Sequence, residues 1–197
     1  MQRRTLSLVL LLVAAALPLS ASQFIDVPFD EVARGSRYIV RAHVIDTYSA
    51  WDESREVIYT YATLRVTRYF GETTGPDTLV VREVGGTIDG YTQEAVGFPE
   101  VRRGEQVVLM LANDGADLRI HAYNQGKFLV RQRAGTEVLI SDPVKQGDVR
   151  LERPRFSMAV DAVGDDVPAL TMDEFASMVD DARAGLPLDR TPLRQQQ

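Results

Sequence analysis

The feature that most constrains the fold is a series of about seven short runs rich in β-branched and aromatic residues, between residues 38 and 140. Turn signals, such as the Asn-Asp-Gly of residues 113–115, separate the runs. Within the first run, Val40, Ala42 and Val44 alternate with polar side chains, which is the period of a half-buried strand. The pattern predicts a mainly β chain, folded as an antiparallel barrel or sandwich of about seven strands.

One helix is expected on each side of this series. Residues 28–35 begin with proline, which suits a first helical turn, and end with glycine, which suits a helix stop. Near the C terminus, Thr171 and Glu174 have the spacing of a capping box, and apolar residues then recur at helical spacing as far as Gly185. The residues that this amphipathic C-terminal helix should bury are Phe175, Met178, Val179 and Ala182.

The N-terminal segment has the order of a secretory signal peptide. Two arginines precede an apolar run from Leu6 to Leu19, and small residues follow at positions 20–22. The run is shorter than the roughly 20 residues that a membrane-spanning helix needs. We therefore expect a signal peptide over residues 1–22, export to the periplasm or the medium, a single domain over 23–186 and a disordered tail over 187–197.

Charge and composition narrow the possible partners and sites. Residues 1–22 contain two arginines and no acidic residue, so the rest of the chain holds 20 basic and 28 acidic residues, a formal charge of −8. Nucleic-acid binding needs a basic surface, and we therefore expect no nucleic-acid partner. The chain has no cysteine, which excludes thiolate zinc sites and thiol catalysis. No transmembrane segment is expected in the mature chain.

The residues that could carry chemistry favour a binding protein over an enzyme. His43 and His121 are expected to be strand residues that point outward or form local hydrogen bonds, because no ligand spacing such as His-Glu-x-x-His accompanies them. No serine lies in a Gly-x-Ser-x-Gly context. We expect no catalytic residue, no metal site and no cofactor. A hydrolase whose site one sequence does not reveal is the alternative from another class.

The loop over residues 85–104 is the best candidate for function. Connections of this length in compact domains are often functional, and this one combines glycines with aromatic side chains suited to an interface. The alternative is that the loop folds back and plugs the barrel. Trp51, in a segment expected to be a turn (residues 49–55), has the same two interpretations. The candidate partner-binding residues are Trp51, Gly85, Gly86, Tyr91, Phe98 and Pro99.

Several short strings within residues 29–132 resemble a family of uncharacterised exported bacterial β-barrel proteins. They include residues 40–44, 58–66, 81–86, 97–99, 104–109 and 125–128. The resemblance implies an OB-fold-like barrel that is more loosely similar to the netrin-like modules of tissue inhibitors of metalloproteinases. Those inhibitors act through an N-terminal cysteine, which this chain lacks.

The predicted function is therefore an exported, non-enzymatic binding module. Its partner is expected to be a protein or an envelope component, and the resemblance implies a link to a secreted protease. A structural envelope protein that holds a lipid inside the barrel is a further alternative.

Overall fold

The computed structural model describes residues 27–95, 97–141 and 169–188. The predicted signal peptide and almost all of the predicted tail lie outside these residues. The helical elements are α2 (Phe29–Gly35), the 3-10 turn η1 (Tyr123–Gly126) and α3 (Met172–Ala184). The strands are β1 (Tyr38–Trp51), β2 (Ile58–Tyr69), β3 (Thr78–Val84), β4 (Gly86–Ile88), β5 (Tyr91–Gln93), β6 (Gln106–Asp114), β7 (Asp117–Ile120), β8 (Lys127–Arg133), β9 (Thr136–Ser141) and β10 (Leu170–Thr171).

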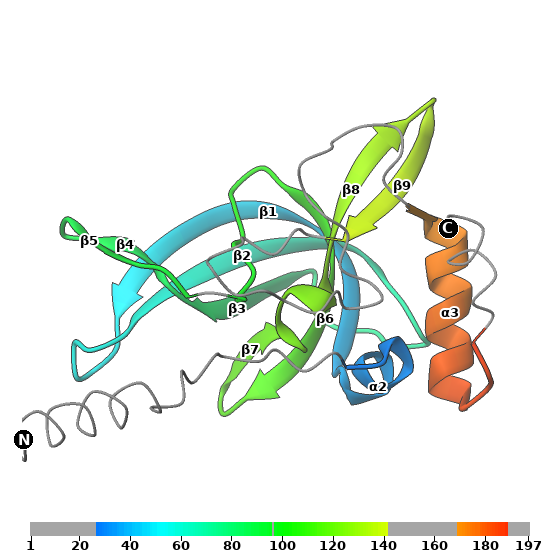
Figure 1. The fold of residues 1–197 in the computed structure, drawn as a ribbon, viewed down its shortest axis with the longest axis horizontal. Coiled ribbons are helices and arrows are strands. Elements are labelled where there is room, and N and C mark those ends of the chain that lie inside the picture. The colour runs from blue at the N-terminus through cyan, green and yellow to red at the C-terminus, as the bar shows by residue number, and fades with distance from the viewer. Residues whose placement is uncertain (1–26, 96, 142–168, 189–197) are drawn as a thin grey trace, which may run out of the picture.

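The main sheet contains a ring of strands in the order β1-β2-β3-β7-β6, because β6 also pairs with β1 (Figure 1). Four of its pairings are antiparallel, but β3 and β7 run parallel. The prediction of an antiparallel sheet was wrong at this seam, because a ring with an odd number of strands cannot alternate direction throughout. The seam consists of one residue pair, Val81 with Leu118, so the barrel is not closed.

Strand β6 has both faces buried, which explains the nearly continuous apolar run in its sequence. Its Val107, Leu109 and Leu111 face the inside of the ring, whereas Val108 and Met110 face the helices. The ring interior is filled by small and medium-sized apolar side chains from each of its five strands and by Val101. Besides Val101 and the three residues of β6, the ring interior contains Val40, Ala42, Val44, Ala62, Leu64, Leu79, Val81 and Ile120.

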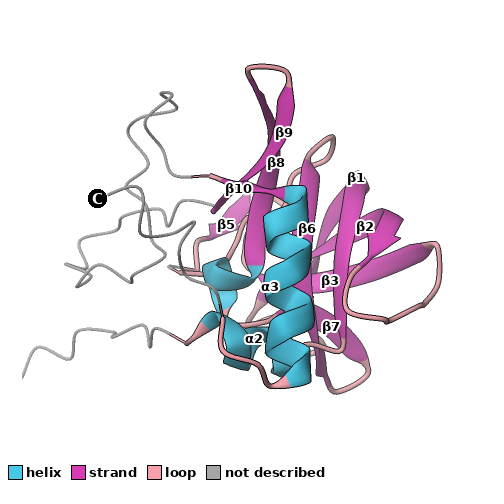
Figure 2. Ribbon diagram, turned by 90° about the vertical axis from the view of Figure 1, so that its right-hand side faces the viewer, coloured by secondary structure: helices cyan, strands magenta, loops and turns pink. Residues whose placement is uncertain are grey.

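The two helices cover the outer face of the sheet near β6, β8 and β9 (Figure 2). Helix α3 begins with the predicted capping box: the Thr171 hydroxyl accepts from the Glu174 backbone N–H, and the Glu174 carboxylate accepts from the Thr171 N–H. It ends before Gly185, which has φ 71°. The predicted buried face of this helix is confirmed, since Phe175, Met178, Val179 and Ala182 are all buried.

Two local predictions near the candidate loop were wrong. Trp51 is the last residue of β1, not part of a turn, because β1 continues past a bulge near Val44 and pairs with β2 as far as Trp51–Ile58. Residues 85–104 are not an irregular loop throughout, since they begin with the hairpin β4–β5. This hairpin and the helices α2 and α3 lie at opposite ends of the molecule (Figure 1).

Within the described ranges, no helix has the length and apolar character needed to cross a membrane.

Candidate functional site

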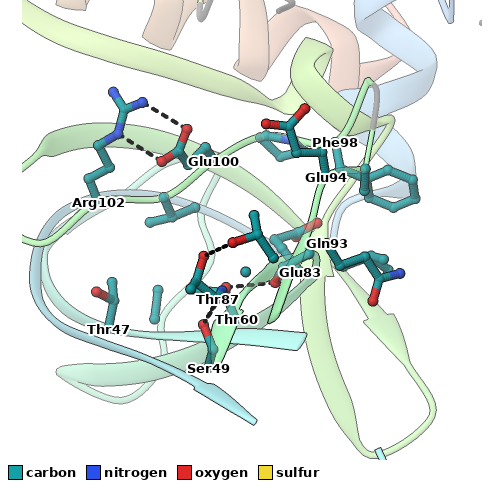
Figure 3. A pocket seen from close by; sticks show the side chains of 18 of the residues that line it. Thr47, Ser49, Thr60, Glu83, Thr87, Gln93, Glu94, Phe98, Glu100 and Arg102 are labelled. Carbon is teal, nitrogen blue, oxygen red and sulfur yellow. Dashed lines mark hydrogen bonds and ion pairs between the residues drawn. The ribbon is translucent and has the colours of Figure 1, made fainter. Parts of the chain in front are cut away.

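A pocket of about 850 Å³ lies between the ends of β1, β2 and β3 and the segment that runs from Gln93 to Arg103. The strands contribute Thr47, Ser49, Thr60 and Glu83 to its wall (Figure 3). The hairpin β4–β5 contributes Thr87 and Thr92, whose hydroxyl oxygens lie 3.0 Å apart. The pocket thus combines a wall made by the sheet with a wall made by the candidate loop.

The polar wall is a continuation of the ring interior. Side chains of one strand face point the same way at every second residue, so paired residues on neighbouring strands form rows across the sheet. One such row consists of Thr47, Ala62 and Val81, in which Ala62 pairs with both of the others. Thr47 is its one polar member. The next row is entirely polar and consists of Ser49, Thr60 and Glu83. The change from apolar to polar rows marks the inner end of the pocket.

Glu83 is buried, with 6% of its surface exposed. Its Oε1 accepts a 2.5 Å hydrogen bond from the backbone N–H of Ile120, which ties β3 to β7 beside the open seam. Burial raises the pKa of the Glu83 carboxyl from its ordinary value of 4.5 to about 8, although this hydrogen bond and the Arg119 charge oppose the shift. Glu83 therefore holds its proton at neutral pH. Its second oxygen, Oε2, has no hydrogen-bond partner among the described residues. It is not sealed off, because Arg41 Nε is the one fully buried side-chain polar atom there that lacks a partner.

The hairpin β4–β5 is fixed to the first residues of β2 by a set of hydrogen bonds. Gly85 N–H donates to the Ile58 carbonyl (2.7 Å), and the Ile58 N–H donates to the Gln93 side chain (2.6 Å). The Thr60 hydroxyl donates to the Gly85 carbonyl (2.7 Å). At the tip, Asp89 and Gly90 have φ of 54° and 80°, the backbone of a tight two-residue hairpin turn. The hairpin is therefore held in a defined position.

Gly86 is required where the hairpin leaves the sheet. A Cβ atom at this position would lie 2.5 Å from Ser49 Oγ and from Thr60 Oγ1, and its φ of 138° disfavours other residues. We expect Gly86→Ala to lower the free energy of unfolding by about 1–3 kcal/mol, measured by urea denaturation. Gly90→Ala is the matched control, because a Cβ at Gly90 meets no atom within 4 Å while the backbone is again left-handed. Equal losses would show that the contacts with Ser49 and Thr60 are unimportant.

The segment after the hairpin folds back onto the ring. Pro99 and Val101 are buried, and Val101 belongs to the ring interior. Lys127 of β8, with 1% of its surface exposed, donates to the Glu100 carbonyl and forms an ion pair with Glu105 (Nζ to Oε2, 3.0 Å). A buried lysine requires such partners, so this contact fixes the segment that closes the pocket.

The predicted site residues divide into two groups. Gly85, Gly86, Phe98 and Pro99 line the pocket. Trp51 and Tyr91 do not line it; their rings meet edge to face with centroids 5.7 Å apart. Tyr91 is 64% exposed, more than any other large apolar side chain in the described part of the chain.

Phe98 lines the pocket and also contacts the 3-10 turn η1. It is half-buried, and its ring packs edge to face on Tyr123 at 4.9 Å. The C-terminal part of the candidate loop thus packs as a plug would, whereas the hairpin tip remains exposed.

Sequence reasoning missed Glu83 and Lys127. For Glu83 a signal was present, because Leu79, Val81 and Glu83 occupy alternate positions of one strand and only the last is charged. A polar residue at a core position is costly unless it has a role, so the period-two pattern could have identified it. Lys127 gave no such signal, since nothing in the sequence connects it to Glu105.

The histidines lie away from the pocket. His121 follows β7 and is not a strand residue as predicted. Its Nδ1 lies 3.2 Å from Ser36 Oγ and 3.1 Å from the Val32 carbonyl, so it contacts the end of α2, which is distant in sequence, and the predicted local hydrogen bond is wrong. His43 lies in β1, opposite Arg65 and Gln106. Across the described residues, no three His, Cys, Asp or Glu side chains are grouped so that they could hold a metal ion.

No protein-family model, no curated protein and no solved structure matches this chain significantly. The family resemblance drawn from the sequence therefore stays a prediction.

Proposed function

We propose that this chain is an exported, non-enzymatic binding module that contacts a protein or envelope partner through Trp51 and Tyr91. The observation that carries the proposal is the exposed Tyr91 ring, held against Trp51 on a hairpin that hydrogen bonds fix to the sheet. Rigid aromatic side chains bury a large area on a partner at little cost in conformational entropy. Because the hairpin is already ordered, binding need not pay for folding it.

The strand order supports an OB-like description of the ring. A five-stranded, partly open barrel with the order β1-β2-β3-β7-β6 fits the general plan of that fold, in which ligands bind on one side of the barrel. Export is part of the same proposal and rests on the N-terminal sequence.

The two alternative functions have weaker support. A hydrolase using His43 or His121 would need one of them beside a carboxylate in the pocket, and neither lines it. A lipid carrier would need space inside the ring, where apolar side chains from all five strands pack together. Both observations favour binding at the surface over chemistry or storage within the barrel.

The experiment is capture of partners from periplasm and culture medium by the mature chain, compared between variants. We expect Trp51→Ala and Tyr91→Ala each to weaken recovery of the captured partner by tenfold or more, since aromatic anchors at an interface contribute most of its affinity. Tyr48→Ala is the matched control, because Tyr48 is also exposed (54%) but stacks on Tyr61 instead. Equal recovery with all three variants would contradict the proposal.

A further inference from the structure

The pocket behind the hairpin has a use that partner binding through Trp51 and Tyr91 does not explain. Neither of those residues lines it, so it forms a second candidate site. Its volume of about 850 Å³ falls in the range, roughly 300–1,000 Å³, of sites for small molecules. Its polar groups converge from β1, β2, β3 and the hairpin, as the side chains in Figure 3 show.

Two groups on the inner wall are available to a ligand. Oε2 of Glu83 has no hydrogen-bond partner within the described part of the chain, and the residue is only 6% exposed. The Thr47 hydroxyl likewise has no partner there, and it belongs to the neighbouring row of the same wall. Neither oxygen is among the fully buried side-chain atoms that lack a partner, since Arg41 Nε is the one such atom in the described residues. Both oxygens are therefore open to the pocket, where a ligand can form hydrogen bonds with them.

The charge distribution favours a neutral ligand. Glu83 is protonated at neutral pH, and the other groups of the inner wall are the hydroxyls of Thr47, Ser49 and Thr60. The ionised side chains that line the pocket are exposed at its rim, where Glu100 and Arg102 form an ion pair of 2.7 Å. A charged ligand would lose its hydration at the inner wall without meeting an opposite charge.

We propose that this pocket binds a neutral saccharide, with the Glu83 carboxyl and the Thr47 hydroxyl as its hydrogen-bond partners on the inner wall. A sugar carries several hydroxyl groups that both donate and accept, as these two partners require. It also presents apolar C–H faces, which match the apolar surfaces that Phe98, Pro99 and Val101 contribute to the lining of the pocket.

The test measures binding of four neutral probes by calorimetry and saturation-transfer NMR. The probes are glucose, N-acetylglucosamine, cellobiose and diacetylchitobiose, and n-butylammonium serves as a cationic comparison. We expect at least one sugar to bind at millimolar concentration or below. Thr47→Val and Glu83→Leu should each weaken that binding by about tenfold or more, because each removes a hydrogen bond at a desolvated site.

Glu83→Gln is the most informative variant, since an amide resembles a protonated carboxyl group. It should retain the affinity within about threefold at neutral pH. The affinity of the parent chain should fall as the pH rises past about 8, whereas that of Glu83→Gln should not. The charged groups nearest to Glu83 are Arg82 on its own strand, Asp114 of β6 and Arg119 of β7, and they are common to both chains.

Two controls separate this proposal from the one above. Trp51→Ala and Tyr91→Ala should leave sugar binding unchanged, because neither residue lines the pocket. Thr47→Val should also keep the parent melting temperature, so that a loss of binding does not reflect unfolding. Three results would each overturn the proposal: no binding of any sugar at tens of millimolar, unchanged affinity in Thr47→Val and Glu83→Leu, or binding of n-butylammonium that strengthens with pH and is lost in Glu83→Gln.

Discussion

Replacing Phe175 with alanine should lower the free energy of unfolding by about 3–5 kcal/mol. Phe175 is fully buried, and its ring meets three others edge to face: Phe29 at 5.7 Å, Phe70 at 5.3 Å and Phe128 at 5.2 Å. Phe29 belongs to α2 and Phe128 to β8, and Phe70 directly follows β2. The substitution would therefore leave a cavity at the point where both helices meet the sheet, and neighbouring rings cannot all move to fill it.

Urea denaturation of the parent chain and of Ser177→Ala provides the comparison for Phe175. Ser177 lies on the same helix but is exposed, and its replacement should change the free energy of unfolding by less than about 0.5 kcal/mol. A loss in Phe175→Ala no greater than that in Ser177→Ala would mean that α3 does not dock on the sheet through this face.

The parts of the fold that could be predicted depend on local sequence. The capping box of Thr171 and Glu174 and the buried face of α3 follow from spacing along one helix, and both are confirmed. The parallel seam between β3 and β7 could not be read from the sequence, because strand direction depends on how many strands complete the ring. The extension of β1 to Trp51 was missed because its sequence is polar: Thr47 and Ser49 pair with β2 and line the pocket, and neither gives an apolar strand signal.

The candidate site was predictable only in part. Glycine and aromatic composition led to the segment 85–104, and four of the six candidate residues do line the pocket. Glu83 belongs to the inner wall of the pocket, and Lys127 fixes the segment that closes it. Both act through contacts with residues that are distant in sequence, Ile120 and Glu105. Alternation within β3 could have revealed Glu83, whereas the pairing of Lys127 with Glu105 depends on tertiary structure alone.

The second large effect concerns Glu83 and the pH dependence of stability. The pKa of Glu83 is about 8 in the folded chain and should be near 4.5 in the unfolded chain, so the folded state binds the additional proton between these values. The contribution of Glu83 to stability is therefore fully present below about pH 4.5 and is lost as the pH rises through about 8. The difference in pKa corresponds to a loss on the order of 5 kcal/mol, and water entering through the pocket would reduce it.

Glu83→Gln should remove this loss, because glutamine cannot ionise and its Oε1 can still accept from the Ile120 N–H. We expect the variant to gain stability relative to the parent chain progressively between about pH 5 and pH 9, with the largest difference at the alkaline end. Urea denaturation across this range measures the difference. Thr47→Val on the same wall is the control, since it introduces no change in titration and should keep the stability of the parent chain at every pH. A constant difference between Glu83→Gln and the parent would mean that Glu83 is ionised in the folded chain, and the seam between β3 and β7 would then be held by a buried carboxylate.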